Sequence, residues 1–167
     1  SISGQYLMVL TQGADYALYV NAAGYLFRSL NFNYEHNYNP KPVVIDIDLD
    51  KAGAGAVVVL NNIFFEVDKY DLAPKSKTEL NKVVRFLLDN PKIKVEISGH
   101  TDDTGTVSHN QTLSLKRAQS AGDYLSQNGI PLARVRQVGY GSTKPLRPND
   151  NDENRQINRR IEFRILP

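Results

Sequence analysis

Asp102 and Arg117 are the residues of this 167-residue sequence whose chemistry most directly suggests a ligand. The aspartate lies in a polar loop, residues 99–105, and the arginine lies in the next segment, which has the periodicity of a helix. A planar guanidinium can hold a carboxylate by two parallel hydrogen bonds, while an aspartate can accept hydrogen bonds from an ammonium group. The two residues could therefore bind the zwitterionic head of an amino acid.

Helical spacing predicts a polar stripe beside this loop. Asn110, Ser114 and Arg117 stand at i, i+4 and i+7, so one face of the helix presents all three. We expect the guanidinium to be partly exposed there. On spacing alone two other interpretations stay open, because Asp102 could simply pair with Arg117 or could cap its own loop.

Two histidines near the same loop raise the question of a metal or catalytic site. His100 and His109 lie close in sequence to Asp102 and Asp103, and imidazole with carboxylate ligands suits zinc and other first-row metals. However, His109 has no ligand-type partner at i, i+4, and the sequence has no cysteine, no nucleophile elbow and no pair of acids spaced for glycan cleavage. We predict a binding protein without metal, cofactor or catalysis, with a metal-dependent hydrolase as the enzymatic alternative.

The charge balance argues against a nucleic-acid partner. The chain has 20 Lys and Arg against 18 Asp and Glu, a formal net charge of +2. The arginines near the C-terminus are interspersed with acids, as in Arg155, Arg159, Arg160 and Arg164 among Asp150, Asp152, Glu153 and Glu162. The longest apolar runs are far shorter than the roughly 20 residues that cross a bilayer, so we predict no transmembrane segment.

Periodicity predicts the elements that position these residues. Two amphipathic helices are expected, at about 74–90 with Leu80, Val83 and Leu87 buried, and at about 108–127 with Leu115, Ala118, Gly122 and Leu125 buried. Strands are predicted at 57–65, 93–99, 134–139 and 157–166, and alternation gives those at 93–99 and 157–166 one buried face. The order β-α-β-α-β-β indicates an α+β sandwich, in which two main helices pack on one mixed sheet and loops at one end form a cleft.

The N-terminal third has a different character. Residues 1–52 are rich in Tyr and Asn and predict short β-strands followed by a proline-rich linker, residues 37–42, and one more strand at 43–49. We place the boundary between this β-strand segment and the main domain, residues 53–167, at the change of pattern. The tyrosines of these strands could alternatively serve a protein–protein interaction module.

An ordered set of motifs in residues 61–166 resembles a known family. The matching residues are Ile97-Ser98-Gly99-His100-Thr101-Asp102, Gly105, Asn110, Leu113-Ser114, Arg117-Ala118, Gly129-Ile130, Arg134, Gly139-Tyr140-Gly141, Pro145 and Asn158-Arg159-Arg160-Ile161-Glu162. This pattern is similar to the peptidoglycan-binding C-terminal domains of OmpA, Pal and MotB. The alternative hydrolase would then be a peptidoglycan hydrolase or amidase.

The resemblance implies a ligand and a set of contacts. Asp102 and Arg117 match the residues that clasp meso-diaminopimelate in the stem peptide of peptidoglycan, and Asn110 and Leu113 would contribute secondary contacts. The family often has Phe-Asp-x-Asp where this chain has Phe65-Glu66-Val67-Asp68, so we expect a backbone contact around Phe65 and leave a side-chain contact by Glu66 open. Arg160 could meet the ligand or stabilise the edge of the sheet.

The resemblance also implies a location and partners. It predicts a periplasmic domain tethered to the outer membrane, which anchors an outer-membrane or secretion-machinery protein to the cell wall. Residues 1–52 resemble the last strands of a carboxypeptidase-regulatory-like β-sandwich. That combination is similar to large outer-membrane lipoproteins, including an anchoring component of the type IX secretion machinery.

Overall fold

A computed structural model describes residues 7–9, 15–22, 24–33, 44–60, 63, 65–66 and 68–167. The elements follow one another as β1 (Asp15–Val20), β2 (Arg28–Asn33), β3 (Val57–Leu60), α1 (Pro74–Asp89), β4 (Val95–Gly99), α2 (Val107–Gln127), the 3₁₀ turn η1 (Leu132–Arg134), β5 (Val135–Gly139), α3 (Asp152–Asn158) and β6 (Ile161–Ile165). Within this part of the chain no helix is long and apolar enough to cross a membrane.

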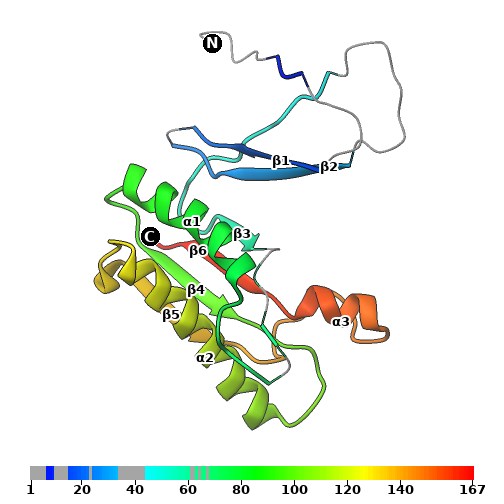
Figure 1. The fold of residues 1–167 in the computed structure, drawn as a ribbon. Coiled ribbons are helices and arrows are strands. Elements are labelled where there is room, and N and C mark those ends of the chain that lie inside the picture. Colours follow the sequence, from blue (N-terminus) through cyan, green and yellow to red (C-terminus); the bar gives the residue numbers. More distant parts are fainter. Residues whose placement is uncertain are drawn as a thin grey trace.

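The main domain is a mixed four-stranded sheet with two long helices on one face (Figure 1). The strand order is β3-β6-β4-β5, with β4 parallel to β5 and antiparallel to β6, which in turn is antiparallel to β3. Helices α1 and α2 bury their apolar faces against the inner face of this sheet, together with Ile97, Phe163 and Ile165. The predicted α+β fold, with two main helices on one mixed sheet, is confirmed.

The last strand begins later than the sequence pattern predicted. Residues 152–158, part of which we expected to be strand, form the short helix α3 instead. The Asn151 side chain accepts a hydrogen bond from the Asn154 backbone N–H at 2.8 Å, and two acidic residues follow in the first turn. A side-chain cap and favourable charges at the helix N-terminus therefore outweigh the alternation of the sequence.

Helix α2 packs so closely on the sheet that two strand positions beneath it, both glycine, have no room for a side chain. A Cβ atom built on Gly99 would lie 2.1 Å from the carbonyl oxygen of Ser114, and one on Gly139 would lie 2.4 Å from the Leu115 nitrogen. The buried stripe of the helix is centred near Ala121, so Leu115 falls at its margin and is 36% exposed, contrary to the prediction that it would be buried. This contact brings the start of α2 directly over the loop that follows β4.

Both faces of β4 are covered, whereas the sequence predicted one buried face. Glu96 and Ser98 point to the side without helices, and each is almost fully buried. There the Tyr140 hydroxyl donates to Glu96 at 3.0 Å, and Arg160 pairs with Glu162 at 2.7 Å. A layer of paired polar side chains therefore shields this face in place of a helix.

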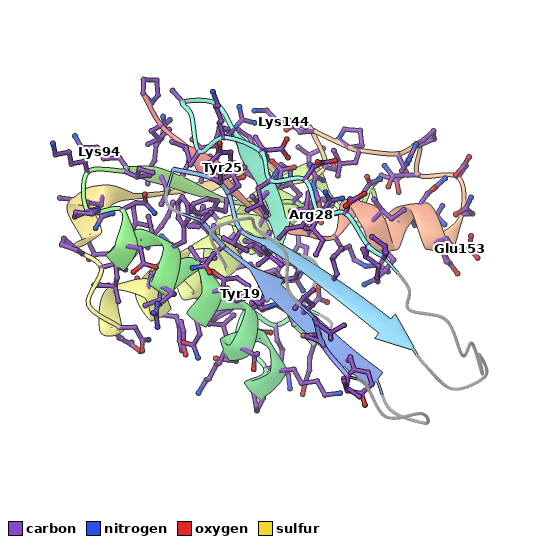
Figure 2. The ribbon with its side chains drawn as sticks, turned by 90° about the horizontal axis from the view of Figure 1, so that it is seen from above. Tyr19, Tyr25, Arg28, Lys94, Lys144 and Glu153 are labelled. Carbon is purple, nitrogen blue, oxygen red and sulfur yellow. The ribbon has the colours of Figure 1, made fainter. Side chains whose placement is uncertain are left out.

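The N-terminal strands are confirmed as an antiparallel hairpin, β1 with β2. The hairpin lies beside α1 when the molecule is seen from above (Figure 2), and Lys82 of α1 donates to the Ser29 hydroxyl at 2.7 Å. Phe27 enters the main core, with its ring centroid 6.1 Å from that of Phe86 and 6.3 Å from that of Phe163. The division of the chain at residues 52 and 53 stays a prediction.

Residues 44–49, the described part of the strand predicted at 43–49, do not form a strand. They run without a regular ladder, and the nearest pairing is a single bridge between Tyr25 and Lys51. The Leu26 N–H donates to the Asp50 carbonyl at 2.7 Å, which holds the end of this segment. The predicted linker at 37–42 lies outside the described residues.

Candidate functional site

Asp102 is positioned by the loop that leaves β4. The Thr101 N–H donates to the Gly141 carbonyl at 3.0 Å, and Asp102 Oδ1 accepts from the Thr104 N–H at 3.0 Å. Asp102 Oδ2 accepts a hydrogen bond from Arg159, and the residue is only 6% exposed. Burial raises the pKa of Asp102, but the hydrogen bonds from Arg159 and Thr104 outweigh it and hold the pKa below its ordinary value. The site therefore contains a fixed, ionised carboxylate.

Arg117 is buried, contrary to the prediction of a partly exposed guanidinium. It is 9% exposed, its Nε donates to the Lys69 carbonyl at 3.0 Å, and its Nη2 donates to the Glu66 carbonyl at 3.2 Å. The ring of Phe65 lies beneath it, with the centroid 4.9 Å from the guanidinium carbon. Burial lowers the pKa of Arg117 from its ordinary value, although an arginine stays charged at neutral pH.

The two charges are separate rather than paired. In the described part of the chain Asp102 forms an ion pair with Arg159, and Arg117 binds backbone carbonyls. The interpretation that Asp102 caps its own loop is confirmed by the bond from Thr104, whereas pairing with Arg117 is not observed. Asn110, two turns before Arg117 on α2, donates to the Asp102 carbonyl at 3.3 Å, so the loop and the helix that carry the two charges are joined directly.

Asn110 fastens the loop to the start of α2. Its amide donates to the carbonyls of Asp102 at 3.3 Å and of Thr104 at 3.0 Å, and the residue is 3% exposed. The Thr106 hydroxyl caps α2 by accepting from the His109 N–H at 3.2 Å. The Asn110 amide is thus engaged by the loop, and Leu113 is buried one turn further along.

The structure brings Arg159 to this group and not Arg160. The Arg160 guanidinium lies on the opposite side of the chain, where it donates to Glu162 at 2.8 Å and to the Lys144 carbonyl at 3.0 Å. Sequence reasoning named Arg160 and missed Arg159. The alternation of side chains along the extended chain could have indicated this. Ile161 faces the core, so Arg159, two residues earlier, lies on the same side, and Arg160 points to the other side.

The residues proposed for a metal site do not converge. His100 is buried on the outer face of the sheet, with Nε2 3.3 Å from the Ser98 hydroxyl, whereas His109 Nε2 lies 3.1 Å from Asp68 Oδ1. Among the residues that the structure describes, no group of three or more metal-ligand side chains is found. Glu66 is exposed and pairs with Lys69, so its side chain points away from Arg117's carbonyl contacts.

The wall of the site opposite α2 is the segment around residues 65–70. Its carbonyls hold Arg117, its Asp68 contacts His109, and Lys116 lies 4.9 Å from the ring centroid of Tyr70. Asp68 adopts a left-handed backbone conformation with φ of 55°. Several contacts with α2 therefore fix this wall beside the buried guanidinium of Arg117.

Comparison with known proteins gives a family match over most of this domain. Residues 64–159, more than half of the chain, match the profile of the OmpA family. The chain is 34% identical over 104 residues to Outer membrane porin F of Pseudomonas fluorescens, covering 62% of this chain and 32% of the porin. It is 34% identical over 100 residues to the Peptidoglycan-associated lipoprotein of Buchnera aphidicola, covering 60% of this chain and 58% of that protein.

A solved structure gives the same result for the fold. The C-terminal domain of Helicobacter pylori MotB superposes with a TM-score of 0.59 at 26% sequence identity, covering 64% of this chain and 83% of that domain. Because the chain spans 32% of the porin and 58% of the lipoprotein, these matches concern only part of each of those two proteins.

Proposed function

The chain belongs to the OmpA family, and from this premise we propose that its C-terminal domain binds peptidoglycan without cleaving it and so anchors a larger protein to the cell wall. The name of the Buchnera relative, a peptidoglycan-associated lipoprotein, supports this assignment. The observation that carries it is that the buried Arg117 guanidinium is held by backbone carbonyls and forms no ion pair with a described residue. Its positive charge therefore suits the carboxylate of a ligand whose ammonium meets the ionised Asp102.

The ligand that fits best is the zwitterionic end of diaminopimelate in the stem peptide. Its ammonium would meet the Asp102 carboxylate, and its carboxylate would meet Arg117. The Nη1 atom of Arg117 makes no hydrogen bond to any described residue, whereas Nε and Nη2 are engaged, so Nη1 is the donor left for a ligand carboxylate. Each charge is held before the ligand arrives, which lowers the entropic cost of binding.

The neighbouring residues would shape the rest of the cleft. Arg159 would keep the Asp102 carboxylate ionised and oriented, and Asn110 would fix the loop rather than touch the ligand through its engaged amide. Phe65 and the backbone of Glu66 would form the wall on which Arg117 rests, and Leu113 would add apolar surface.

The cell envelope is the compartment that this function requires. Peptidoglycan lies in the periplasm of Gram-negative bacteria, and the relatives include an outer-membrane porin and a lipoprotein. We infer that the domain is periplasmic and that the protein it anchors, an outer-membrane or secretion-machinery component, supplies the tether.

Two conservative substitutions test the clamp. Arg117→Lys keeps the charge but cannot make both carbonyl bonds and still present a separate N–H donor to the ligand, and Asp102→Asn keeps the shape without the charge. Each should weaken binding of a diaminopimelate peptide about tenfold to a hundredfold, which is the value of one hydrogen bond to a charged group. Isothermal calorimetry gives the affinity, and co-sedimentation with purified sacculi gives wall binding.

A remote ion pair provides the matched controls. Arg85 and Asp89 lie 3.6 Å apart on α1 and are largely exposed, so Arg85→Lys and Asp89→Asn repeat the two chemical changes away from the site. These controls should bind as wild type does. Equal binding of a lysine-type peptide, which lacks the second carboxylate, would contradict the two-charge clamp, and release of muropeptides from the sacculi would contradict binding without cleavage.

A further inference from the structure

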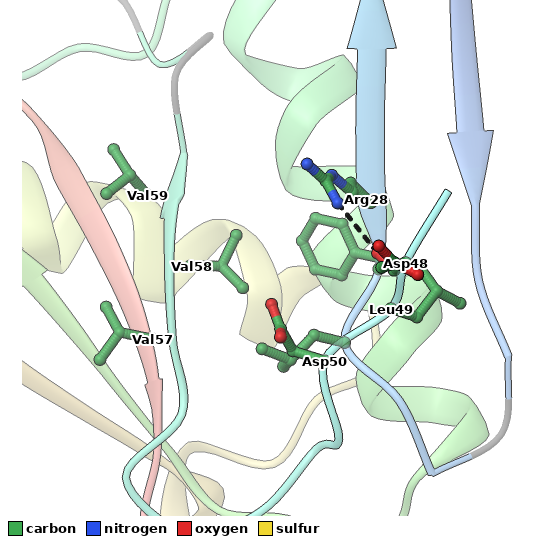
Figure 3. A pocket seen from close by; sticks show the side chains of 9 residues that line it. Arg28, Asp48, Leu49, Asp50, Val57, Val58 and Val59 are labelled. Atoms are coloured by element: carbon green, nitrogen blue, oxygen red, sulfur yellow. Dashed lines mark hydrogen bonds between the residues drawn. The ribbon is translucent and has the colours of Figure 1, made fainter. Parts of the chain in front are cut away.

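Strand β3 forms one edge of the sheet, and a cavity lies along it. Among the strands that the structure describes, β3 pairs with β6 alone. On its other side lies a cavity of about 320 Å³, lined by Val57, Val58 and Val59 across from Asp48, Leu49 and Asp50 (Figure 3). Because side chains of a strand alternate, three consecutive lining residues mean that the strand's backbone edge itself forms the wall.

The hydrogen-bond register shows which backbone groups face the cavity. The Ile165 N–H donates to the Ala56 carbonyl at 2.9 Å, and the Ile165 carbonyl accepts from the Gly55 N–H at 2.8 Å. A bulge at Gly55 and Ala56 thus takes the place of a hydrogen-bonded pair with Ile165. In an antiparallel ladder such pairs alternate, so Val58 bonds to Phe163 while the N–H and C=O groups of Val57 and Val59 point away from β6. These groups form an unpaired edge of the kind to which an added strand binds.

The opposite wall is an extended, acidic segment. It is held by the bond from Leu26 to Asp50 and by Arg28, whose Nη1 donates to the Asp48 carbonyl at 3.0 Å. Among the described residues no cation pairs with the carboxylates of Asp46, Asp48 or Asp50, and Asp50 points across the cavity towards Val58 (Figure 3). The cavity thus has an apolar floor formed by Leu26 and Phe27, one hydrogen-bonding wall and one acidic wall. Arg28 also lines it, with one guanidinium nitrogen bonded to the Asp48 carbonyl, so two carboxylates face one cation there.

We propose that this groove is a second binding site, which takes an extended cationic segment of a partner protein as an added strand beside β3. The backbone of the segment would bond to Val57 and Val59, and its lysine or arginine side chains would lie against Asp48 and Asp50. A volume of about 320 Å³ lies at the lower end of ligand pockets, which suits a short stretch of chain. A second copy of this protein fits less well, since symmetric pairing of two β3 edges would bring the acidic walls together.

Short synthetic peptides test this site on the full chain. A fluorescein-labelled peptide of alternating Lys and Val should bind in an anisotropy titration, while its Glu–Val counterpart should not. A third peptide keeps the Lys–Val sequence but carries N-methyl groups on the backbone amides that would face β3. This peptide has the same charge and lacks the donors, so its binding should fall about tenfold or more if a strand forms.

Two substitutions in the protein complete the test. Val59→Pro removes an N–H at the free edge of β3 but no hydrogen bond to β6, and an edge strand tolerates such a proline. The substitution should weaken binding of the Lys–Val peptide as strongly as N-methylation of the peptide does. Asp48→Asn combined with Asp50→Asn should weaken it without touching the backbone of β3. Binding to sacculi should be unchanged in both variants, so this inference can fail while the proposed anchoring function stands.

Three outcomes would overturn the inference. They are undetectable binding of the Lys–Val peptide, equal binding of its N-methylated form, and a concentration-dependent dimer that Val59→Pro abolishes. Undetectable binding would show that the edge of β3 takes no added strand. Equal binding of the N-methylated form would show that charge alone attracts the peptide, and the dimer would show that a second copy of the chain occupies the groove. Should Val59→Pro fail to fold, the N-methylated peptide still decides between strand addition and simple charge attraction.

Discussion

Replacing His100 with glutamine should remove a pH-dependent part of the protein's stability. The imidazole is 2% exposed, its Nδ1 is buried without a hydrogen-bond partner among the described residues, and its Nε2 lies 3.7 Å from Glu162. Burial, assisted by the positive charge of Arg160, lowers the pKa of His100 from 6.5 to about 4. The folded protein therefore favours the neutral imidazole, whereas the unfolded chain takes up a proton near pH 6.5.

The sign and size of the effect follow from this difference. The pKa of His100 is lower in the folded protein than in the unfolded chain. The contribution of His100 to the free energy of unfolding is therefore fully present above the unfolded pKa and is lost as the pH falls from about 6.5 towards about 4. Each pH unit in that window corresponds to about 1.4 kcal/mol, so at about pH 5 wild type should have lost roughly 2 kcal/mol through this residue.

Urea unfolding followed by circular dichroism measures this directly. The free energy of unfolding is determined at about pH 7 and about pH 5 for wild type and for His100→Gln, and the difference between the two pH values is compared. His109→Gln, at a largely exposed imidazole, controls for the loss of a histidine in general. If His100→Gln kept the full pH dependence of wild type, the burial of a neutral His100 would not be its cause.

Three further predictions concern packing and the site. Gly99→Ala should lower the free energy of unfolding by about 1–3 kcal/mol or more, since its Cβ would lie 2.1 Å from the Ser114 carbonyl; urea unfolding measures this, and an unchanged midpoint would contradict the close approach of α2. Phe27→Ala should cost about 3–5 kcal/mol, because its ring is buried in the main core, and calorimetry should show a lower Tm for the whole domain rather than for the hairpin alone. Arg159→Gln should raise the pKa of Asp102 by removing its hydrogen bond. As the pH is lowered, the variant should therefore stop binding sacculi at a higher pH than wild type does. An unchanged pH profile would show that Arg159 does not act on this carboxylate.

Local sequence patterns were sufficient to predict the helices and the inner face of the sheet. The runs that became α1 and α2 and the alternation of Ile161, Phe163 and Ile165 report burial against a single apolar layer, which is a property of each segment alone. The loop with Asp102 and the helix with Arg117 were expected together and are found together.

The features that the sequence did not reveal depend on distant partners. The strand predicted at 43–49 is not formed, because in the described part of the chain residues 44–49 meet no strand with which to form a ladder. The sequence predicted a partly exposed Arg117, because nothing in its helix indicates that the carbonyl groups of residues 66 and 69 would cover the guanidinium. The buried state of Glu96 likewise depends on Tyr140, which is distant in sequence.

The position of Phe27 has a mechanical consequence if the domain bears load as the proposed wall anchor would. Tension arriving from the N-terminal side would first separate β1 from β2, whose antiparallel pairs from Asp15 onward open one at a time and so yield at low force. The same tension would then reach Phe27, whose ring must leave the core before any load falls on β3. The hairpin would thus lengthen under small loads, while the buried Phe27 ring, together with the backbone bonds that join Gly24 and Leu26 to Ala52 and Asp50, would resist larger ones.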